Sequence, residues 1–486
     1  MKKKRTYGST DVERLDLLAL IRLLTVGCIV AVDVAKTRFV AAIATATGDV
    51  LKIVRFAHPV QTWAFLRVME ALQEAQLAPR VVMEPTGTYG DALRYQCHVR
   101  GVSIEMMSPK HTHDFAEVLD GVPSMHDPKA AVALARLAVI RPSRGWSPDS
   151  EQKRDVRALL DRRWPLSTTQ ALYHGHLEAM LARHWPELGS LIDVHEQRSW
   201  MPLLRQYPGP RAVGAASEEA AQVLRKASRG RLSSERVAAI VEAARTSLGM
   251  PMTKGEETKL RSIVEQIEQQ TKGLDAVDRE LSEMVAKDEV MSRLAVVVGP
   301  ACAASIVSHV GSPTSFATPS ALEKAMGLNL KVKSSGNGEG KLHITKRGPA
   351  QVRQLLYLAA LRLLKSDRIV AAWCRARKSY GGESKKRKAI VAVMRKLVRA
   401  LWHVARGATF DASKLFDVRR LDLSGAADKN AATAPVTATQ PTQDVRRLDL
   451  SGAADKDAVT APVTANQPPQ AAPSLRCEGG VPQQHA

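Results

Sequence analysis

Three acidic residues stand where carboxylates could hold a metal ion. Asp33 ends the apolar run IVAVD, Glu84 ends the run RVVME, and Asp127 opens a helical segment in HDPKAAVALARL. Carboxylates at the ends of adjacent strands and at the start of a nearby helix can converge on one edge of a sheet. Hard divalent cations bind such oxygen clusters, and a pair of Mg²⁺ ions held in this way can catalyse phosphoryl transfer.

Each of these acids also has an ordinary structural interpretation. Asp33 could cap a turn, and Glu84 could pair with a lysine. Asp127, followed by Pro128, has the pattern of a helix start. The positions of the acids alone therefore leave the catalytic and the structural interpretations open.

The second candidate for chemistry is segment 331–348, with the sequence KVKSSGNGEGKLHITKRG. It combines two adjacent serines with four glycines and five lysine or arginine residues. Glycines allow a close backbone approach to a phosphate, basic side chains neutralise it, and a serine could attack a phosphodiester. The alternative is a basic nucleic-acid-contact loop without a covalent role. The candidate nucleic-acid-binding residues are Lys333, Lys341, Lys346 and Arg347.

The elements that must position the acids follow from periodicity. Residues 27–56 read as consecutive strands of a meander, because apolar β-branched runs are broken by AKT and TGD. Strands followed by alternating helices and strands predict an α/β domain with a mixed sheet over residues 27–150. The further predicted elements are a helix over 60–76, a strand ending at Glu84, a helix over 91–100, a strand over 102–107 and a helix over 126–139.

Residues 151–290 are predicted to be helical. Seven of the eight seam positions of a heptad pattern between Leu260 and Met284 are apolar. This pattern favours a coiled-coil hairpin or helix pair over an ordinary amphipathic helix.

Residues 291–416 are predicted to form a mainly helical domain, which carries basic helices and the loop 331–348 with its two serines (the serine loop). Segment 363–407 repeats Arg and Lys on a helical background, with Trp373 and Trp402 between them. We expect it to neutralise phosphates, and the alternative is a solvated basic face. Residues 1–26 are predicted to be an extension, and the low-complexity tail 417–486, with the segment DVRRLDLSGAADK in two copies, to be disordered.

The composition favours a nucleic acid as the partner. Lys and Arg number 70 against 49 acids, a net charge of +21, which attracts polyanions, although a merely basic surface would give the same count. The five cysteines form no CxxC pair, which argues against disulfide or zinc frameworks and favours a reducing compartment. No apolar run of membrane-spanning length occurs, so we expect a cytoplasmic, nucleoid-associated protein with no membrane partner.

Several stretches, taken in order, resemble the insertion-sequence 110 family of transposases, which includes the Piv-type DNA invertase. The match covers about residues 27–412 and includes VAVDVAKTRFVAAI, VVMEPTGTYGDAL, PSMHDPKAAVALARL, LARHWPEL and SSGNGEGKLHITKRG. The most specific features are MEPTGTYG together with the SSG and ITKRG motifs.

The resemblance implies an RNase H-like (RuvC-like) N-terminal domain with a DEDD metal site that uses Mg²⁺ or Mn²⁺. It also implies a coiled-coil region and a C-terminal transposase domain with a catalytic serine. Carried over by motif, the acids fall on Asp33, Glu84 and Asp127, and the nucleophile falls on Ser335, with Ser334 as the second choice. The implied activity is RNA-guided, site-specific DNA recombination by a dimer or tetramer. Its implied partners are DNA and a non-coding guide RNA from the element itself.

The sequence departs from the family at two positions of one motif. The fourth acid is replaced by Ala130, and Met125 stands where the family has a lysine. Water, His126 or Asp120 could supply the missing ligand. Two alternatives to an active transposase follow: a RuvC-type metal-dependent nuclease, or a decayed copy that binds nucleic acid without recombining it.

Overall fold

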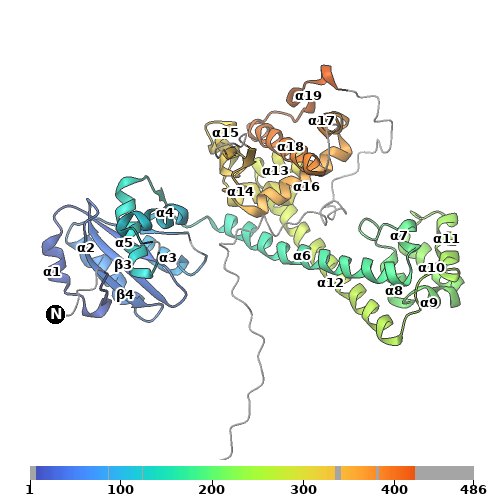
Figure 1. Ribbon diagram of the computed structural model, residues 1–486, viewed down its shortest axis with the longest axis horizontal. Coiled ribbons are helices and arrows are strands. Elements are labelled where there is room, and N and C mark those ends of the chain that lie inside the picture. Colours follow the sequence, from blue (N-terminus) through green and yellow to red (C-terminus); the bar gives the residue numbers. More distant parts are fainter. Residues whose placement is uncertain (1–6, 86, 123, 334–340, 379–382, 422–486) are drawn as a thin grey trace, which may run out of the picture. The chain divides into compact units, whose positions relative to one another are not determined.

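The computed structural model describes residues 7–85, 87–122, 124–333, 341–378 and 383–421. The chain forms two compact units, Met1–Glu151 and Gln152–Ala486 (Figure 1). The predicted disordered tail and its duplicated segment lie outside the described residues, except for residues 417–421.

The N-terminal unit is built on a seven-stranded mixed sheet with the order β1-β4-β3-β2-β5-β6-β7. Strands β2, β3 and β4 pair antiparallel in sequence order, which confirms the predicted meander. Strand β5 pairs parallel with β2, and β6 pairs parallel with β5. The bounds are β1 Thr10–Asp11, β2 Cys28–Asp33, β3 Arg38–Thr45, β4 Val50–Ala57, β5 Pro79–Met83, β6 Ser103–Met106 and β7 Arg144–Gly145.

Helices cover both faces of this sheet, so its central strands are buried on both sides. In β2, Val30 and Val32 belong to the core on the face of α1, α2 and α3, whereas Ile29 and Ala31 pack with α5 on the other face. This alternation follows from the two-residue period of a strand. The helices are α1 Leu17–Leu23, α2 Thr62–Glu74, α3 Asp91–Val99, α4 Pro109–Asp120 and α5 Asp127–Ile140.

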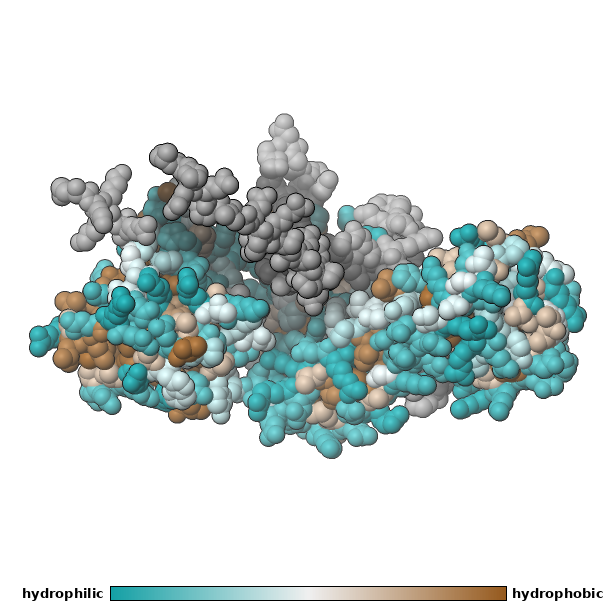
Figure 2. Space-filling model, turned by 90° about the horizontal axis from the view of Figure 1, so that it is seen from below, coloured by the Kyte–Doolittle hydropathy of each residue, from teal (hydrophilic) through white to brown (hydrophobic). Residues whose placement is uncertain are grey.

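Residues 7–26 fold onto this sheet. Strand β1 pairs parallel with β4, and Val12, Leu20 and Leu24 are buried in the same core as Val30. Other apolar side chains of the N-terminal unit remain exposed, among them Leu18. Figure 2 shows hydrophobic residues gathered at its left end, where this unit lies. Residues 7–26 of the predicted extension are therefore part of the sheet and core of the N-terminal unit.

Two long helices, α6 (Glu151–His184) and α12 (Lys254–Ala286), form an antiparallel pair in the second unit. Arg163 of α6 bonds Asp278 of α12 at 2.6 Å, whereas Gln170, one heptad later, bonds Thr271, one heptad earlier, at 2.8 Å. The predicted seam is confirmed as the buried face of α12, because six of its eight positions are buried. Its coiled-coil character stays a prediction.

Five short helices pack beside the C-terminal part of α6 and the N-terminal part of α12. Their core contains the fully buried Trp185 and Trp200, and the indole N–H of Trp200 donates to the Val194 carbonyl at 3.0 Å. The helices are α7 Leu188–Leu191, α8 Trp200–Gln206, α9 Pro210–Ala215, α10 Ser217–Ser228 and α11 Ser234–Arg245.

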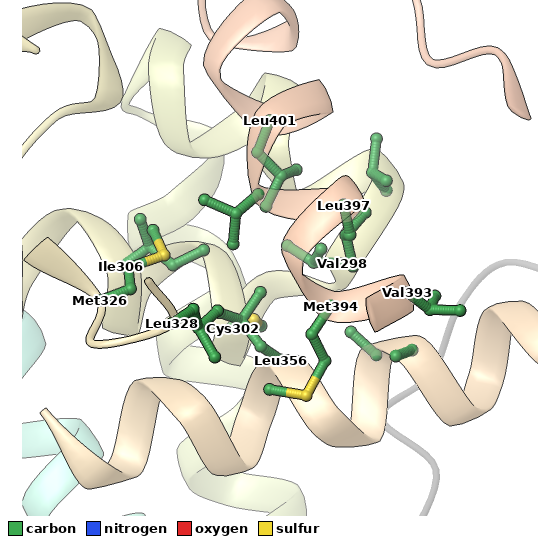
Figure 3. Close-up of a cluster of buried hydrophobic side chains, with 14 of the residues drawn as sticks. Val298, Cys302, Ile306, Met326, Leu328, Leu356, Val393, Met394, Leu397 and Leu401 are labelled. Carbon is green, nitrogen blue, oxygen red and sulfur yellow. The ribbon is translucent and has the colours of Figure 1, made fainter. Parts of the chain in front are cut away.

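The described residues between 289 and 421 form a helical core that carries one hairpin. Figure 3 shows side chains from several helices meeting there, including Cys302, Leu356 and Leu397. The elements are α13 Glu289–Val298, α14 Pro300–His309, α15 Pro319–Ala325, β8 Leu330–Lys333, β9 Lys341–Ile344, α16 Ala350–Ser366, α17 Arg368–Lys378, α18 Glu383–Val404 and α19 Ala412–Leu415.

Candidate active site

Two of the predicted acids leave adjacent parallel strands at the same edge of the sheet. Asp33 is the last residue of β2, Glu84 directly follows β5, and the preceding residues Val32 and Met83 are register partners. By the strand alternation, Asp33 lies on the face that α5 covers, together with Ala31. Asp33 and Glu84 are both half-buried.

The third acid approaches this edge from the helix on the same face. Asp127 is the first residue of α5, and α5 packs against β2 and β3. The helix start is defined by His126, whose ring accepts a hydrogen bond from the Lys129 amide at 3.3 Å, and by Pro128 in the first turn. The side chain of Asp127 is exposed.

The electrostatics of Asp33 reflect the presence of the other two acids. Burial, as the largest cause, and the negative charges of Asp127 and Glu84 together raise the pKa of Asp33 from the ordinary 3.8 to about 7. A hydrogen bond to the backbone at Val34 opposes the increase. The three carboxylates are therefore near enough to repel one another, which is the situation that a bound cation relieves.

Among the residues that the structure describes, no three His, Cys, Asp or Glu side chains converge closely enough to hold one metal ion. The donor set nevertheless fits a hard divalent cation, because it consists of carboxylate oxygens.

The position expected for the fourth acid is one helical turn beyond Asp127. Ala130 is half-buried in α5, three residues after Asp127, and therefore lies on the same side of the helix. Its methyl group offers no oxygen. Met125, where the family has a lysine, is 40% exposed.

The two side chains considered as replacements are already engaged. One oxygen of Asp120 accepts from Lys129 Nζ at 2.7 Å, and the other accepts from the Tyr7 hydroxyl at 2.9 Å. The His126 ring is the cap of α5. The hydrogen bonds of Asp120 and His126 thus favour structural roles for both.

Arg94 is a site residue that the sequence analysis missed. Its side chain is nearly fully buried, and its guanidinium donates to the Glu84 carbonyl at 3.4 Å and to Asp91. It therefore holds the chain where the strand gives way to the PTGTYG loop. Its position in an amphipathic helix gave no sign of this role, because arginines in such helices usually face solvent.

The serine loop joins the two strands of an exposed hairpin. Strands β8 and β9 pair antiparallel, with Lys333 opposite Lys341 as the last pair before the connection. The predicted nucleophile Ser335, and Ser334, lie in this connection, outside the described residues. Of the predicted phosphate contacts, Lys346 and Arg347 follow β9 and are exposed.

The base of this hairpin depends on two glycines in close contact. A Cβ at Gly327 would lie 2.7 Å from the Arg347 amide nitrogen, and one at Gly348 would lie 2.5 Å from the Ala325 carbonyl oxygen. Gly327 also has a φ of +70°, and its carbonyl accepts from the Lys346 amide at 2.9 Å. This contact anchors the ITKRG segment to the helical core.

The expectation for the basic segment 363–407 needs partial correction. Arg395 and Arg399 bond the buried Glu323, at 2.6 and 3.0 Å, so that these charges are used inside the protein. Trp402 donates to the Phe316 carbonyl at 2.9 Å, and Trp373 belongs to the hydrophobic core. Two of these arginines and both tryptophans therefore contribute to the fold.

Two family models match the chain, and together with the mixed α/β unit and the helical unit they define its class. A DEDD transposase model matches residues 30–186, and a model described as the transposase IS116/IS110/IS902 family matches residues 296–375. The protein is a transposase of the DEDD group, a group that generally depends on divalent metal ions. It belongs to the IS110 family, which confirms the resemblance seen in the sequence.

No curated protein sequence matches the chain significantly. Among the described helices there is none whose length and apolar character would let it cross a membrane.

Proposed function

We propose that this transposase exchanges DNA strands with a metal-bound acidic site formed by Asp33, Glu84 and Asp127, and with Ser335 as the nucleophile. The observation that carries the proposal is geometric: Asp33 and Glu84 leave adjacent parallel strands at one sheet edge, and Asp127 begins the helix on the same face. The raised pKa of Asp33, caused first by burial and then by the two other acids, is consistent with this grouping. Grouped carboxylates of this kind suit Mg²⁺ or Mn²⁺. The antiparallel meander followed by two parallel strands supports the RNase H-like (RuvC-like) fold that the resemblance implies.

Each described residue has a distinct task in this scheme. Asp33 must lose its proton before it can act as a ligand, and Arg94 fixes the backbone that carries Glu84. Exposed Lys346 and Arg347 neutralise phosphates near the hairpin. A bound divalent ion would stabilise the charge that develops on the phosphodiester oxygens.

The serine step conserves the energy of the phosphodiester. The Ser335 oxygen forms a bond to phosphorus, the bond from phosphorus to the leaving sugar oxygen breaks, and the serine proton passes to that oxygen. The reverse reaction, with a hydroxyl of another strand, releases the serine and rejoins DNA without a nucleotide cofactor.

The partners we propose are DNA and a guide RNA encoded by the element, bound by a dimer or tetramer in the cytoplasm, at the nucleoid. The net charge of +21 supports a polyanionic partner. Target choice is then a property of the RNA, and the protein supplies phosphate contacts and chemistry.

A second candidate function is favoured by Ala130. With one carboxylate missing, this copy would bind RNA and DNA without recombining them. One assay of strand exchange, described next, distinguishes the active transposase, the decayed copy and a RuvC-type nuclease.

The test is to incubate the full chain and its co-purifying RNA with element-end and target DNA in Mg²⁺, Mn²⁺ or EDTA. The proposal predicts strand-exchange products with metal and none in EDTA. Hydrolysis without exchange would indicate the nuclease, and binding without reaction would indicate the decayed copy.

A further inference from the structure

The N-terminal extension precedes residues 30–186, which the DEDD transposase model matches, and its Tyr7 contacts Asp120 and His126 close to the acidic site in the chain. The Tyr7 hydroxyl donates to Asp120 Oδ2 at 2.9 Å, and its ring meets that of His126 edge to face, with centroids 5.2 Å apart. Tyr7 also packs against the core formed by α5 and the sheet. It thus contacts the residue that immediately precedes Asp127.

Strand β1 holds this part of the extension in place. Besides the pairing with β4, Arg55 donates to the Ser9 carbonyl at 3.1 Å, and Gln61 donates to Asp11 at 3.2 Å. Tyr7 is therefore attached two residues before an anchored segment.

On the far side of Asp120, a buried lysine fixes the segment that leads into α5. Lys129 is only 1% exposed, and its ammonium group donates to Asp120 Oδ1 at 2.7 Å. It also donates to the carbonyls of Val122 at 2.6 Å and Ser124 at 3.1 Å. An ammonium group has three N–H bonds, and these three acceptors use all of them.

These contacts form a continuous path from the extension to the start of α5. Asp120 joins Tyr7 to Lys129, and Lys129 holds the carbonyls of Val122 and Ser124, which precede His126 and Asp127 in the chain. A chain of hydrogen bonds that ends beside a metal ligand is a common way to orient that ligand.

We infer that Tyr7 is a positioning residue of the acidic site, which sets the location of Asp127 through Asp120 and Lys129. The inference rests on the proposed metal site.

The test compares Tyr7→Phe, which removes only the hydroxyl, and Tyr7→Ala, which also removes the ring. Tyr95→Phe is the matched control, because Tyr95 is an exposed tyrosine of the same unit. Mn²⁺ affinity of the full chain is measured by electron paramagnetic resonance. Amide hydrogen exchange of residues 124–130 is measured without metal, and melting temperatures are recorded for every variant.

We expect Tyr7→Ala to bind Mn²⁺ on the order of tenfold more weakly and to exchange faster at residues 124–130, with a smaller effect for Tyr7→Phe. The control should match the wild type. Unchanged exchange and affinity in Tyr7→Ala would overturn the inference, as would a lower melting temperature with unchanged Mn²⁺ affinity. If the wild-type chain binds Mn²⁺ no better than Asp33→Asn does, the proposed metal site itself is refuted.

Discussion

The acidic cluster (Asp33, Glu84 and Asp127) and the hairpin of β8 and β9 are held in place in different ways. Asp33 and Glu84 lie at the ends of central strands that are covered on both faces, so their backbones are fixed by neighbouring strands. Ser334 and Ser335 lie in the chain between strands β8 and β9. Among the described residues, these two strands pair only with each other. Leu330, Val332 and Leu342 of these strands are exposed.

This difference indicates where each half of the chemistry obtains its precision. A site on central strands is preorganised by the fold, whereas a site on a hairpin connection depends on its base and on what it binds. In this chain the base is supplied by the close contacts of Gly327 and Gly348. We therefore expect substitutions in the acidic cluster to act on metal binding, and those in the hairpin to act on DNA.

The largest effect is expected for Asp33→Asn, which should lower the rate of strand exchange on the order of 10⁴-fold. The fold should survive, because ionised Asp33 is unfavourable in the folded state. Its folded pKa of about 7 lies above the ordinary 3.8, so the folded state holds a proton that the unfolded state has released between these pH values. The free energy of unfolding therefore falls as the pH rises from about 4 to 7.

The variant should therefore lack part of the wild-type fall in melting temperature between pH 5 and pH 8. Asp114→Asn, a change of equal charge at an exposed ion pair with Lys110, is the control for both measurements. An active Asp33→Asn variant would remove the acidic site from the proposed mechanism.

Ser335→Ala should reduce strand exchange on the order of 10³-fold while leaving Mn²⁺ affinity and DNA binding close to wild type. Denaturing gels that detect protein covalently joined to DNA would follow the intermediate. Ser334→Ala is the control. If Ser334→Ala abolishes the adduct and Ser335→Ala does not, the nucleophile is Ser334.

Ala130→Asp should raise Mg²⁺-dependent exchange about tenfold, because it restores an oxygen one turn from Asp127. Wild-type exchange should also be higher in Mn²⁺ than in Mg²⁺. Ala133→Asp, at a buried position of the same helix, would introduce a charge without reaching the site and should only destabilise. Full wild-type activity in Mg²⁺ that Ala130→Asp leaves unchanged would show that three acids suffice.

The smallest effect is expected for Lys346→Gln. Loss of one exposed phosphate contact should weaken DNA binding about threefold and reduce the salt dependence of the logarithm of the binding constant by about 1. Lys272→Gln, at an exposed lysine of α12, is the comparison. Equal effects from both would mean that the hairpin makes no particular contact with DNA.

The sequence predicted correctly that Asp33 and Glu84 lie at strand ends, because a continuous apolar run that stops at a polar residue marks the end of a buried strand. Residues whose partners come from distant segments could not be predicted. Lys129 is buried only because Asp120, Val122 and Ser124 present oxygens to it, and nothing in the helical pattern of α5 indicates this. For the same reason, the sequence could not show that Arg395 bonds Glu323 rather than phosphate.

The central claim is that Asp33 belongs to a divalent-metal site at the edge of the sheet. Mn²⁺ affinity of the full-length wild type, Asp33→Asn and Asp114→Asn, measured at pH 8 and pH 6, tests it directly. Because a proton competes for Asp33, whose pKa is raised to about 7, wild type and Asp114→Asn should bind roughly tenfold more weakly at pH 6. Asp33→Asn should bind poorly at both pH values, whereas wild-type affinity in this variant would contradict the claim.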